Sequence, residues 1–330
     1  MRIVIVGVGR LTSREYQLPN AKTPVELVSE ACRRAERDTG SDENILRDLE
    51  AIGTTPSFCE RRFPKKPLYK NFPKSVANAI GAKRVKYYVH AFHGGNGPQL
   101  MVNEFAEKIS NGEIDSALVT GYEILKTFDN AMRQNQSKEM MIKTWVDRTP
   151  KDRPKTTNAR PRRKNLENVV NMFAKSQSPA YYYGMFENAY RARRGLSNEE
   201  SNRRIGKMYS EFTHIASKSP EHSWYPTVRT SREISDVTVS NFMVCSPYSK
   251  NMCAIERVNQ SAAILIMSEK EAIRRHISKD RWMYVCVVLR SFFYATTTSF
   301  VISPHTDTDT HHHIKTDTCG DVEMPKMWKS

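Results

Sequence analysis

The sequence predicts an α/β fold in which a mostly parallel, five-stranded sheet is covered by helices. Two observations lead to this prediction. Short apolar runs recur along the chain and are followed by capped amphipathic helices, which is the alternation that builds parallel sheets. In addition, residues 85–123 contain a complete strand–turn–helix–strand unit. The strands are predicted at residues 3–8, 49–54, 85–92, 116–120 and 261–267.

The first strand, at residues 3–8, is apolar almost throughout, as expected for a strand that is buried on both faces. Gly7 and Gly9 match two of the three glycines in the GxGxxG fingerprint of dinucleotide-binding proteins, but the third position is Thr12. The chain is therefore not expected to bind a dinucleotide there. Thr23-Pro24-Val25-Glu26 is a capping box with proline at the first helical position, so it predicts the first helix.

The central unit begins with strand 85–92, in which apolar and polar residues alternate. The turn His93–Gly97 that follows contains three glycines, and glycine adopts backbone angles that other residues disfavour. Pro98 opens a helix that ends at Asn111-Gly112, and residues 116–120 form the next strand. Ligands of open α/β sheets bind beyond the carboxyl ends of the strands. The turn is therefore the predicted ligand site, with Gly94, Gly95, Asn96 and Gly97 as its binding residues.

This unit ends in Gly121-Tyr122-Glu123, and its spacing resembles the active-site unit of the thiolase superfamily. The resemblance is closest to the sterol-carrier-type thiolases and their thiolase-like relatives. It extends from Arg2 to about Tyr284, which corresponds to the N-terminal half of a thiolase with its loop domain. It implies an acyltransferase by descent, of the acetyl-CoA C-acyltransferase type. The implied ligand is coenzyme A or acyl-CoA, and no tightly bound cofactor is expected.

Counting back from Gly121 places the nucleophilic cysteine of active thiolases at Gly95 or Gly94, and no cysteine lies between Cys59 and Cys245. His93 is a candidate base, but neither a nucleophile nor an orienting carboxylate stands beside it in the sequence. The resemblance also implies that a histidine and a second cysteine come from a second thiolase half, which the chain is not expected to contain. Ordinary thiolase turnover is therefore not predicted.

Residues 124–250 are expected to form a mainly helical loop domain, inserted into a core made of residues 1–123 and 251–285. A basic run at 148–164 contains three prolines and has three readings. It is a solvated loop, a segment that contacts the phosphates of coenzyme A through Arg160, Arg162 and Arg163, or a nuclear-import or RNA-binding segment, which the lack of interleaved aromatic residues disfavours. Capping signals predict two helices, opening near Ser178 and Ser197. Their apolar residues at helical spacing are expected in the core: Tyr182, Met185, Phe186, Ala189, Tyr190, Ile205, Met208, Tyr209, Phe212 and Ile215.

Residues 286–330 are rich in threonine, aspartate and histidine, which predicts an irregular, disordered tail. Its histidines and Cys319 are read as part of that tail, so no metal site is predicted. No run of 18 apolar residues exists, and no membrane span is expected. The six cysteines show no pairing pattern, the C-terminus is not Ser-Lys-Leu, and no leader is expected ahead of the first strand. These features predict a cytoplasmic protein, with the peroxisome and the mitochondrion left open.

Three hypotheses for function remain. The first is an acyltransferase by descent that binds acyl-CoA. The second is a catalytically silent acyl-CoA-binding or assembly protein that pairs with an intact thiolase. The third is a basic nucleic-acid-associated protein, suggested by the net charge of +15 but disfavoured because aromatic residues do not interleave the basic run. The resemblance further implies a homodimer through strand 85–92, to which Tyr87, Tyr88 and Phe92 would contribute apolar area.

Overall fold

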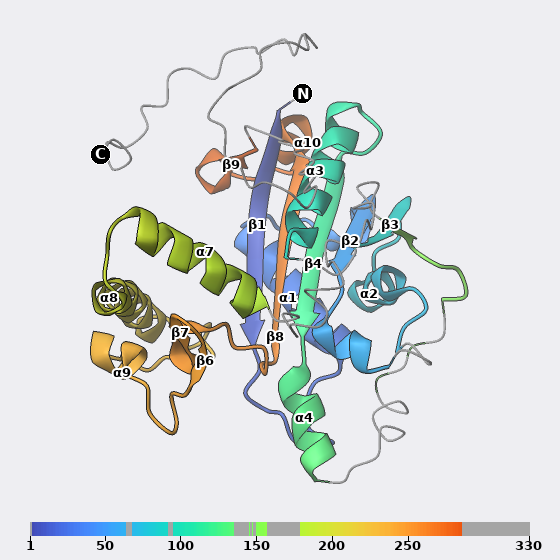
Figure 1. The fold of residues 1–330 in the computed structure, drawn as a ribbon. Helices are drawn as coiled ribbons and strands as arrows, with labels where there is room; N and C mark the ends of the chain where they lie inside the picture. The colour runs from blue at the N-terminus through green and yellow to red at the C-terminus, as the bar shows by residue number, and fades with distance from the viewer. Residues whose placement is uncertain are drawn as a thin grey trace, which may run out of the picture. The chain divides into compact units, whose positions relative to one another are not determined.

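The core is a seven-stranded sheet with the strand order β5-β3-β2-β4-β8-β1-β9. The computed structural model describes residues 2–63, 68–91, 95–134, 145, 147, 150–156 and 179–285, and Figure 1 shows their arrangement. The strands are β1 (Ile3–Thr12), β2 (Ala51–Thr55), β3 (Tyr87–His90), β4 (Ser116–Glu123), β5 (Lys155–Thr156), β8 (Gln260–Ser268) and β9 (Met283–Tyr284). The α/β class and all five predicted strands are confirmed, and the two additional strands are two-residue edges.

The sheet is mostly parallel because five of its strands run in one direction. β2 pairs in parallel with β3 and β4, and β3 pairs in parallel with β5. β8 lies between β4 and β1 and is antiparallel to both, so β1 has the same direction as β4. β9 pairs antiparallel with β1 at the opposite edge. The two reversed strands are therefore the ones that follow the long excursion after β4.

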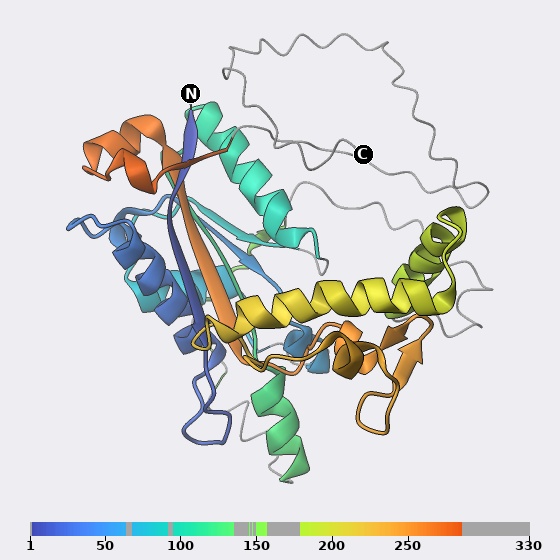
Figure 2. The ribbon, with the colours of Figure 1, turned by 90° about the vertical axis from the view of Figure 1, so that its left-hand side faces the viewer.

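Helices cover both faces of the sheet, as Figure 2 shows. On one face, α1 (Pro24–Asp38) and α2 (Phe72–Ile80) contribute to the larger apolar cluster. On the other face, α3 (Gly97–Ser110) packs through Met101, Phe105, Ala106 and Ile109 against strand residues such as Val119. Met101 is fully buried in this contact, whereas Val102 is only partly buried.

The glycines of β1 allow α1 to lie directly against the strand. A Cβ atom at Gly7 would be 2.2 Å from the carbonyl oxygen of Ala35, and one at Gly9 would be 2.0 Å from that of Ala31. Any side chain would collide with helix backbone, so these positions need glycine for packing. The pattern that partly matches a dinucleotide fingerprint is thus explained by the contact between β1 and α1.

Helix caps follow the sequence signals. The Thr23 hydroxyl accepts a hydrogen bond from Glu26 N, and the Glu26 carboxylate accepts one from Thr23 N, which confirms the capping box of α1. Ser197 and Glu200 form the same box at the start of α8 (Asn198–Ser217).

The remaining elements are α4 (Leu125–Arg133), α7 (Pro179–Arg193), α9 (Ser231–Ser235), β6 (Met243–Cys245), β7 (Tyr248–Ser249), α10 (Glu269–Arg274) and the short 3₁₀ turns η1 (Leu46–Asp48), η2 (Phe58–Arg62), η3 (Lys250–Met252) and η4 (Lys279–Arg281).

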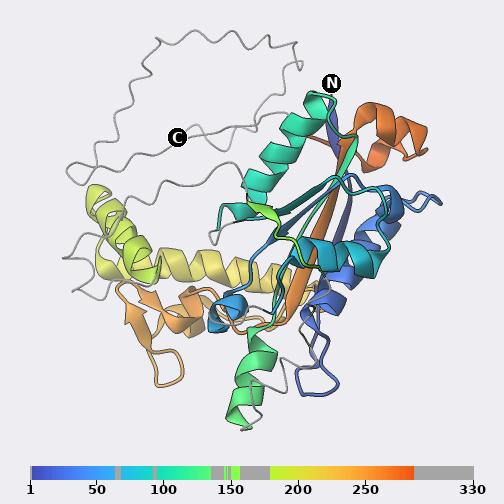
Figure 3. The ribbon, with the colours of Figure 1, turned by 90° about the vertical axis from the view of Figure 1, so that its right-hand side faces the viewer.

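The expectation that the apolar residues of α7 and α8 are core is wrong for most of them. Met185 is 60% exposed and Phe212 is 54% exposed. The physical reason is that this part of the fold offers little to pack against. Its buried apolar cluster consists of Ile205, Ile234 and Met252, and its sheet is the two-stranded β6–β7 pair. Helices α7 and α8, seen in Figure 3, therefore present much of their apolar surface to solvent.

The outer edge of β3 is occupied in part by β5, because Val89 and His90 pair with Lys155 and Thr156. The homodimer predicted through residues 85–92 stays a prediction, as do the domain boundaries. The predicted tail at 286–330 lies outside the described residues. Among the residues that are described, no helix is long and apolar enough to cross a membrane.

Candidate functional site

The carboxyl ends of β2, β3 and β4 meet at one edge of the sheet because these strands are parallel neighbours. Each strand end leads into a different connection: η2 follows β2, the glycine turn and α3 follow β3, and α4 follows β4. The predicted binding residues Gly95, Asn96 and Gly97 lie at this edge, at the start of α3. The other predicted site residues, His93, Gly94, Arg160, Arg162 and Arg163, lie outside the described residues.

The start of α3 has two features that suit a ligand. Asn96 is the N-cap, but its side chain makes no capping hydrogen bond, so it does not satisfy the backbone N–H groups of the first turn. A Cβ atom built at Gly95 would have no atom of the described residues within 4 Å, so that part of the chain leaves open space beside it. An uncapped helix start carries partial positive charge, which favours an anionic group.

The Gly-Tyr-Glu sequence at the end of β4 holds the neighbouring elements together. A Cβ atom at Gly121 would be 1.9 Å from the Thr55 hydroxyl, so a side chain there would force the Thr55 side chain to move. Glu123 accepts hydrogen bonds from Ser57 Oγ at 2.7 Å and from Phe58 N at 2.8 Å. Burial nevertheless raises the pKa of Glu123 above its ordinary value of 4.5. Its observed contacts serve to fix the start of η2.

A polar network joins β2, β3, β4 and η2 on the α2 side of the sheet. His90 Nδ1 lies 2.7 Å from Thr54 Oγ1, and His90 Nε2 lies 3.3 Å from Glu60 Oε2. Tyr122 donates its hydroxyl proton to Glu60 Oε1 at 3.1 Å. Burial is the largest single influence and would raise the pKa of Glu60, but the hydrogen bond and charge of His90 together with hydrogen bonds from Ser57 N and Tyr122 outweigh it, so the pKa is lowered. An ionised Glu60 accepts from Nε2–H, which leaves Nδ1 as the acceptor for Thr54.

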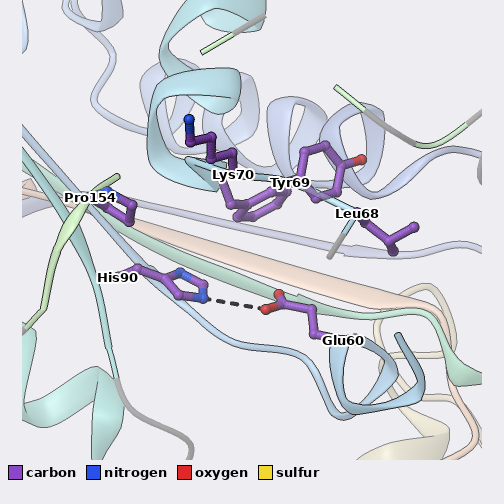
Figure 4. A pocket seen from close by; sticks show the side chains of 7 residues that line it. Glu60, Leu68, Tyr69, Lys70, His90 and Pro154 are labelled. Atoms are coloured by element: carbon purple, nitrogen blue, oxygen red, sulfur yellow. Dashed lines mark hydrogen bonds and ion pairs between the residues drawn. The ribbon is translucent and has the colours of Figure 1, made fainter. Parts of the chain in front are cut away.

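This network borders a cavity of about 60 Å³, which Figure 4 shows between the His90–Glu60 pair and Tyr69 with Lys70. At roughly 30 Å³ per water molecule, it holds about two waters. Sites for cofactors and drug-sized ligands have volumes of about 300–1,000 Å³. The cavity is therefore too small for coenzyme A, and both nitrogens of His90 are already engaged. The network orders the strand ends rather than presenting a base to a large substrate.

None of the cysteines in the described part of the chain is prepared to act as a thiolate. Cys32 and Cys59 are fully buried. Burial raises the pKa of Cys32 to about 12, and burial beside Glu123 raises that of Cys59 even further. Burial also raises the pKa values of Cys245 and Cys253, which lie near β6 and η3. The described residues likewise contain no group of three or more metal-ligating side chains.

Comparison with known proteins gives matches among solved structures, whereas no protein-family model and no curated protein matches. A monomeric SCP2-thiolase-like protein of type 1 from Mycobacterium smegmatis is 29% identical, with a TM-score of 0.59, over 85% of this chain and 48% of that chain. The chain has a thiolase-like fold. The Ltp2-ChsH2(DUF35) aldolase is 15% identical, with a TM-score of 0.54, over 82% of this chain and 57% of that chain. An acetyl-CoA acetyltransferase from Syntrophomonas wolfei is 13% identical, with a TM-score of 0.47, over 84% of this chain and 67% of that chain.

The chain spans about half the length of the first two solved proteins that it matches, namely 48% and 57% of them. Within this thiolase-like fold, the strand–turn–helix–strand unit found in the sequence is β3, α3 and β4. Sequence reasoning missed the pairing of His90 with Glu60, because 30 residues separate them and only the fold brings them together. The period-two pattern marked His90 as a strand residue, and nothing in the irregular segment after β2 singled out Glu60.

Proposed function

We propose that this thiolase-like protein binds coenzyme A or acyl-CoA at the glycine turn between β3 and α3. The observation that carries the proposal is the start of α3, where Asn96 leaves the helix uncapped and Gly95 has open space beside it. This helix start lies at the carboxyl edge of the sheet, where α/β folds bind ligands. Its N–H groups and dipole favour a phosphate or a thioester oxygen.

The same turn explains why we expect binding without ordinary thiolase turnover. Gly95 has no side chain, so no acyl-enzyme can form there, and thiolase-type acyl transfer needs a cysteine nucleophile. His93 and Gly94 belong to the same turn, and Arg160, Arg162 and Arg163 are proposed to contact the phosphates of the nucleotide. The net charge of +15 supports an anionic ligand. The proposal thus describes an acyltransferase-like protein by descent that retains its acyl-CoA site.

The test is calorimetric titration with coenzyme A and with acetyl-CoA, using a matched pair of variants. Asn96→Asp places a carboxylate at the start of α3, where it interacts favourably with the helix dipole and repels an anionic ligand. We expect affinity to fall at least about tenfold while the melting temperature holds or rises. Asn111→Asp makes the same substitution at the C-cap of α3, and we expect it to leave affinity unchanged. Absence of saturable binding by the parent protein contradicts the proposal.

Intact-mass measurement after incubation with acetyl-CoA separates a silent binding protein from an enzyme. We expect no acetyl adduct and no thiolysis of an acyl-CoA substrate. An adduct mapped to the turn at residues 93–97 contradicts the assigned role of Gly95. An adduct on Cys245 or Cys253 places the active site elsewhere. Binding of an oligonucleotide in the absence of coenzyme A binding favours the nucleic-acid hypothesis instead.

A further inference from the structure

Exposed apolar side chains are concentrated in the part of the fold that contains α7 and α8. Of the 20 large apolar residues that are exposed in the described chain, 15 lie between Tyr181 and Ile255. The buried apolar cluster of the same region has only three members, Ile205, Ile234 and Met252. Apolar patches of this kind on a protein surface mark interaction sites.

One stripe of this surface runs along α8. Met208, Phe212 and Ile215 are 43%, 54% and 66% exposed, and their spacing of four and three residues places them on one side of the helix. Arg204 lies four residues before Met208 on this side. Its guanidinium is 5.0 Å from the ring centroid of Tyr190, which is 43% exposed on α7. The stripe therefore continues from α8 onto α7.

A row of charges flanks the stripe. Glu200, Lys207, Glu211 and Lys218 are exposed and follow one another at spacings of seven, four and seven residues, so they share a side of α8. Their signs alternate. Within the described chain, Lys207, Glu211 and Lys218 form no ion pair, whereas the off-row pair Glu199 and Arg203 is only loosely joined at 3.9 Å. The row thus presents three charges that no ion pair within the described residues neutralises.

We propose that α8 packs antiparallel against α8 of a second copy of this chain. A twofold axis that crosses α8 at the level of residue 209, on the side away from the Ile205 cluster, places Glu200 opposite Lys218 of the second copy and Lys207 opposite Glu211. Every charge in the row then meets one of opposite sign, while the apolar stripe is covered. Because a twofold contact uses the same patch on both copies, such self-complementarity is what it requires. An anionic lipid surface fits less well, because Glu200 and Glu211 lie on the same side of α8 as the two lysines and would be repelled by the lipid.

The area suits a reversible dimer. Large side chains bury roughly 150–250 Å² each, so five that are about half exposed offer on the order of 500 Å² per copy. The five are Tyr183 and Tyr190 on α7 with Met208, Phe212 and Ile215 on α8. The area buried on the two copies together, including their charged rims, then approaches about 1,200 Å², which is the lower limit for specific interfaces. This contact does not use the β3 edge, where β5 is paired.

Sedimentation velocity of the full chain across the micromolar range tests the proposal. We expect a monomer–dimer equilibrium that Phe212→Glu weakens at least about tenfold. Lys207→Glu and Glu211→Lys should each weaken the dimer, because each places like charges across the axis. The double variant Lys207→Glu/Glu211→Lys restores opposite signs at both positions, so it should recover the affinity.

Glu199→Lys is the matched control, since it reverses a charge on α8 outside the row and should leave the dimer unchanged. Circular dichroism of each variant confirms that α8 is still folded. A chain that is monomeric throughout, or a dimer indifferent to Phe212→Glu, overturns the proposal. A double variant that stays as weak as the single variants overturns the antiparallel register.

Discussion

Arg275 is the largest charged side chain in the interior, and its removal is the sharpest test of what holds the last part of the fold in place. The residue is only 2% exposed. Its Nε lies 2.6 Å from Glu271 Oε1, and its other two nitrogens lie 3.2 Å from Glu43 Oε2 and 3.4 Å from Asp48 Oδ2. Arg275→Ala therefore removes one buried cation from among three carboxylates.

Removing one partner of a buried ion pair costs about 3–5 kcal/mol, because the remaining charge is left uncompensated. Glu43 and Asp48 are 38% and 36% exposed, so water reaches them after the substitution. Glu271 is only 12% exposed and remains hard to hydrate. We therefore expect a loss near the lower limit, about 3 kcal/mol of unfolding free energy.

The neighbouring Arg274 supplies the control, because it binds the same carboxylate from the surface. Its side chain is 55% exposed and its Nε lies 2.7 Å from Glu271 Oε2. Exposed ion pairs contribute about 0–1 kcal/mol to stability, so Arg274→Ala should lower the free energy of unfolding by less than about 1 kcal/mol. Urea unfolding followed by circular dichroism measures both variants. Equal losses for the two variants would refute the reasoning, because burial would then not distinguish them.

Three further predictions follow from contacts described above. Gly9→Ala should lower the free energy of unfolding by at least about 3 kcal/mol, because the new Cβ atom would collide with the carbonyl oxygen of Ala31. Gly95→Ala should change the free energy of unfolding by no more than about 0.5 kcal/mol in the same urea unfolding assay. Gly95→Cys should fold and react with a thiol reagent, yet show no thiolysis activity. The lowered pKa of Glu60 means that its ionised form stabilises the fold at neutral pH, and this stability is lost as pH falls below 4.5. Glu60→Gln, which weakens the His90 contact, should therefore flatten the decline of melting temperature in acid.

Local signals in the sequence predicted much of the sheet. The capping box at Thr23 and the apolar run at residues 261–267 each depend on neighbours in the chain, so they could be read directly. The glycine turn before α3 was located for the same reason. Asn96 and Gly97 could be placed at the start of α3 because their position follows from the turn itself.

Features that depend on distant partners could not be read in this way. His90 meets Glu60 only because parallel strands align their ends, and no spacing in the sequence encodes that meeting. The apolar spacing of α8 predicts a face that something covers, but not whether the cover is in the same chain. Phe212 was therefore assigned to a core that the described part of the chain does not provide.

The position of β8 has a consequence for how the chain is made. Its nine residues, Gln260–Ser268, fill the space between β1 and β4, so the middle of the sheet closes only after residue 268 has left the ribosome. Until then, β1 and β4 expose unpaired edges, which invite pairing with other chains. The closing contacts also span most of the sequence, from Ile3 to Ser268, and long-range pairing of this kind slows folding. The nascent protein thus depends on protection of two strand edges while the whole excursion between β4 and β8 is synthesised.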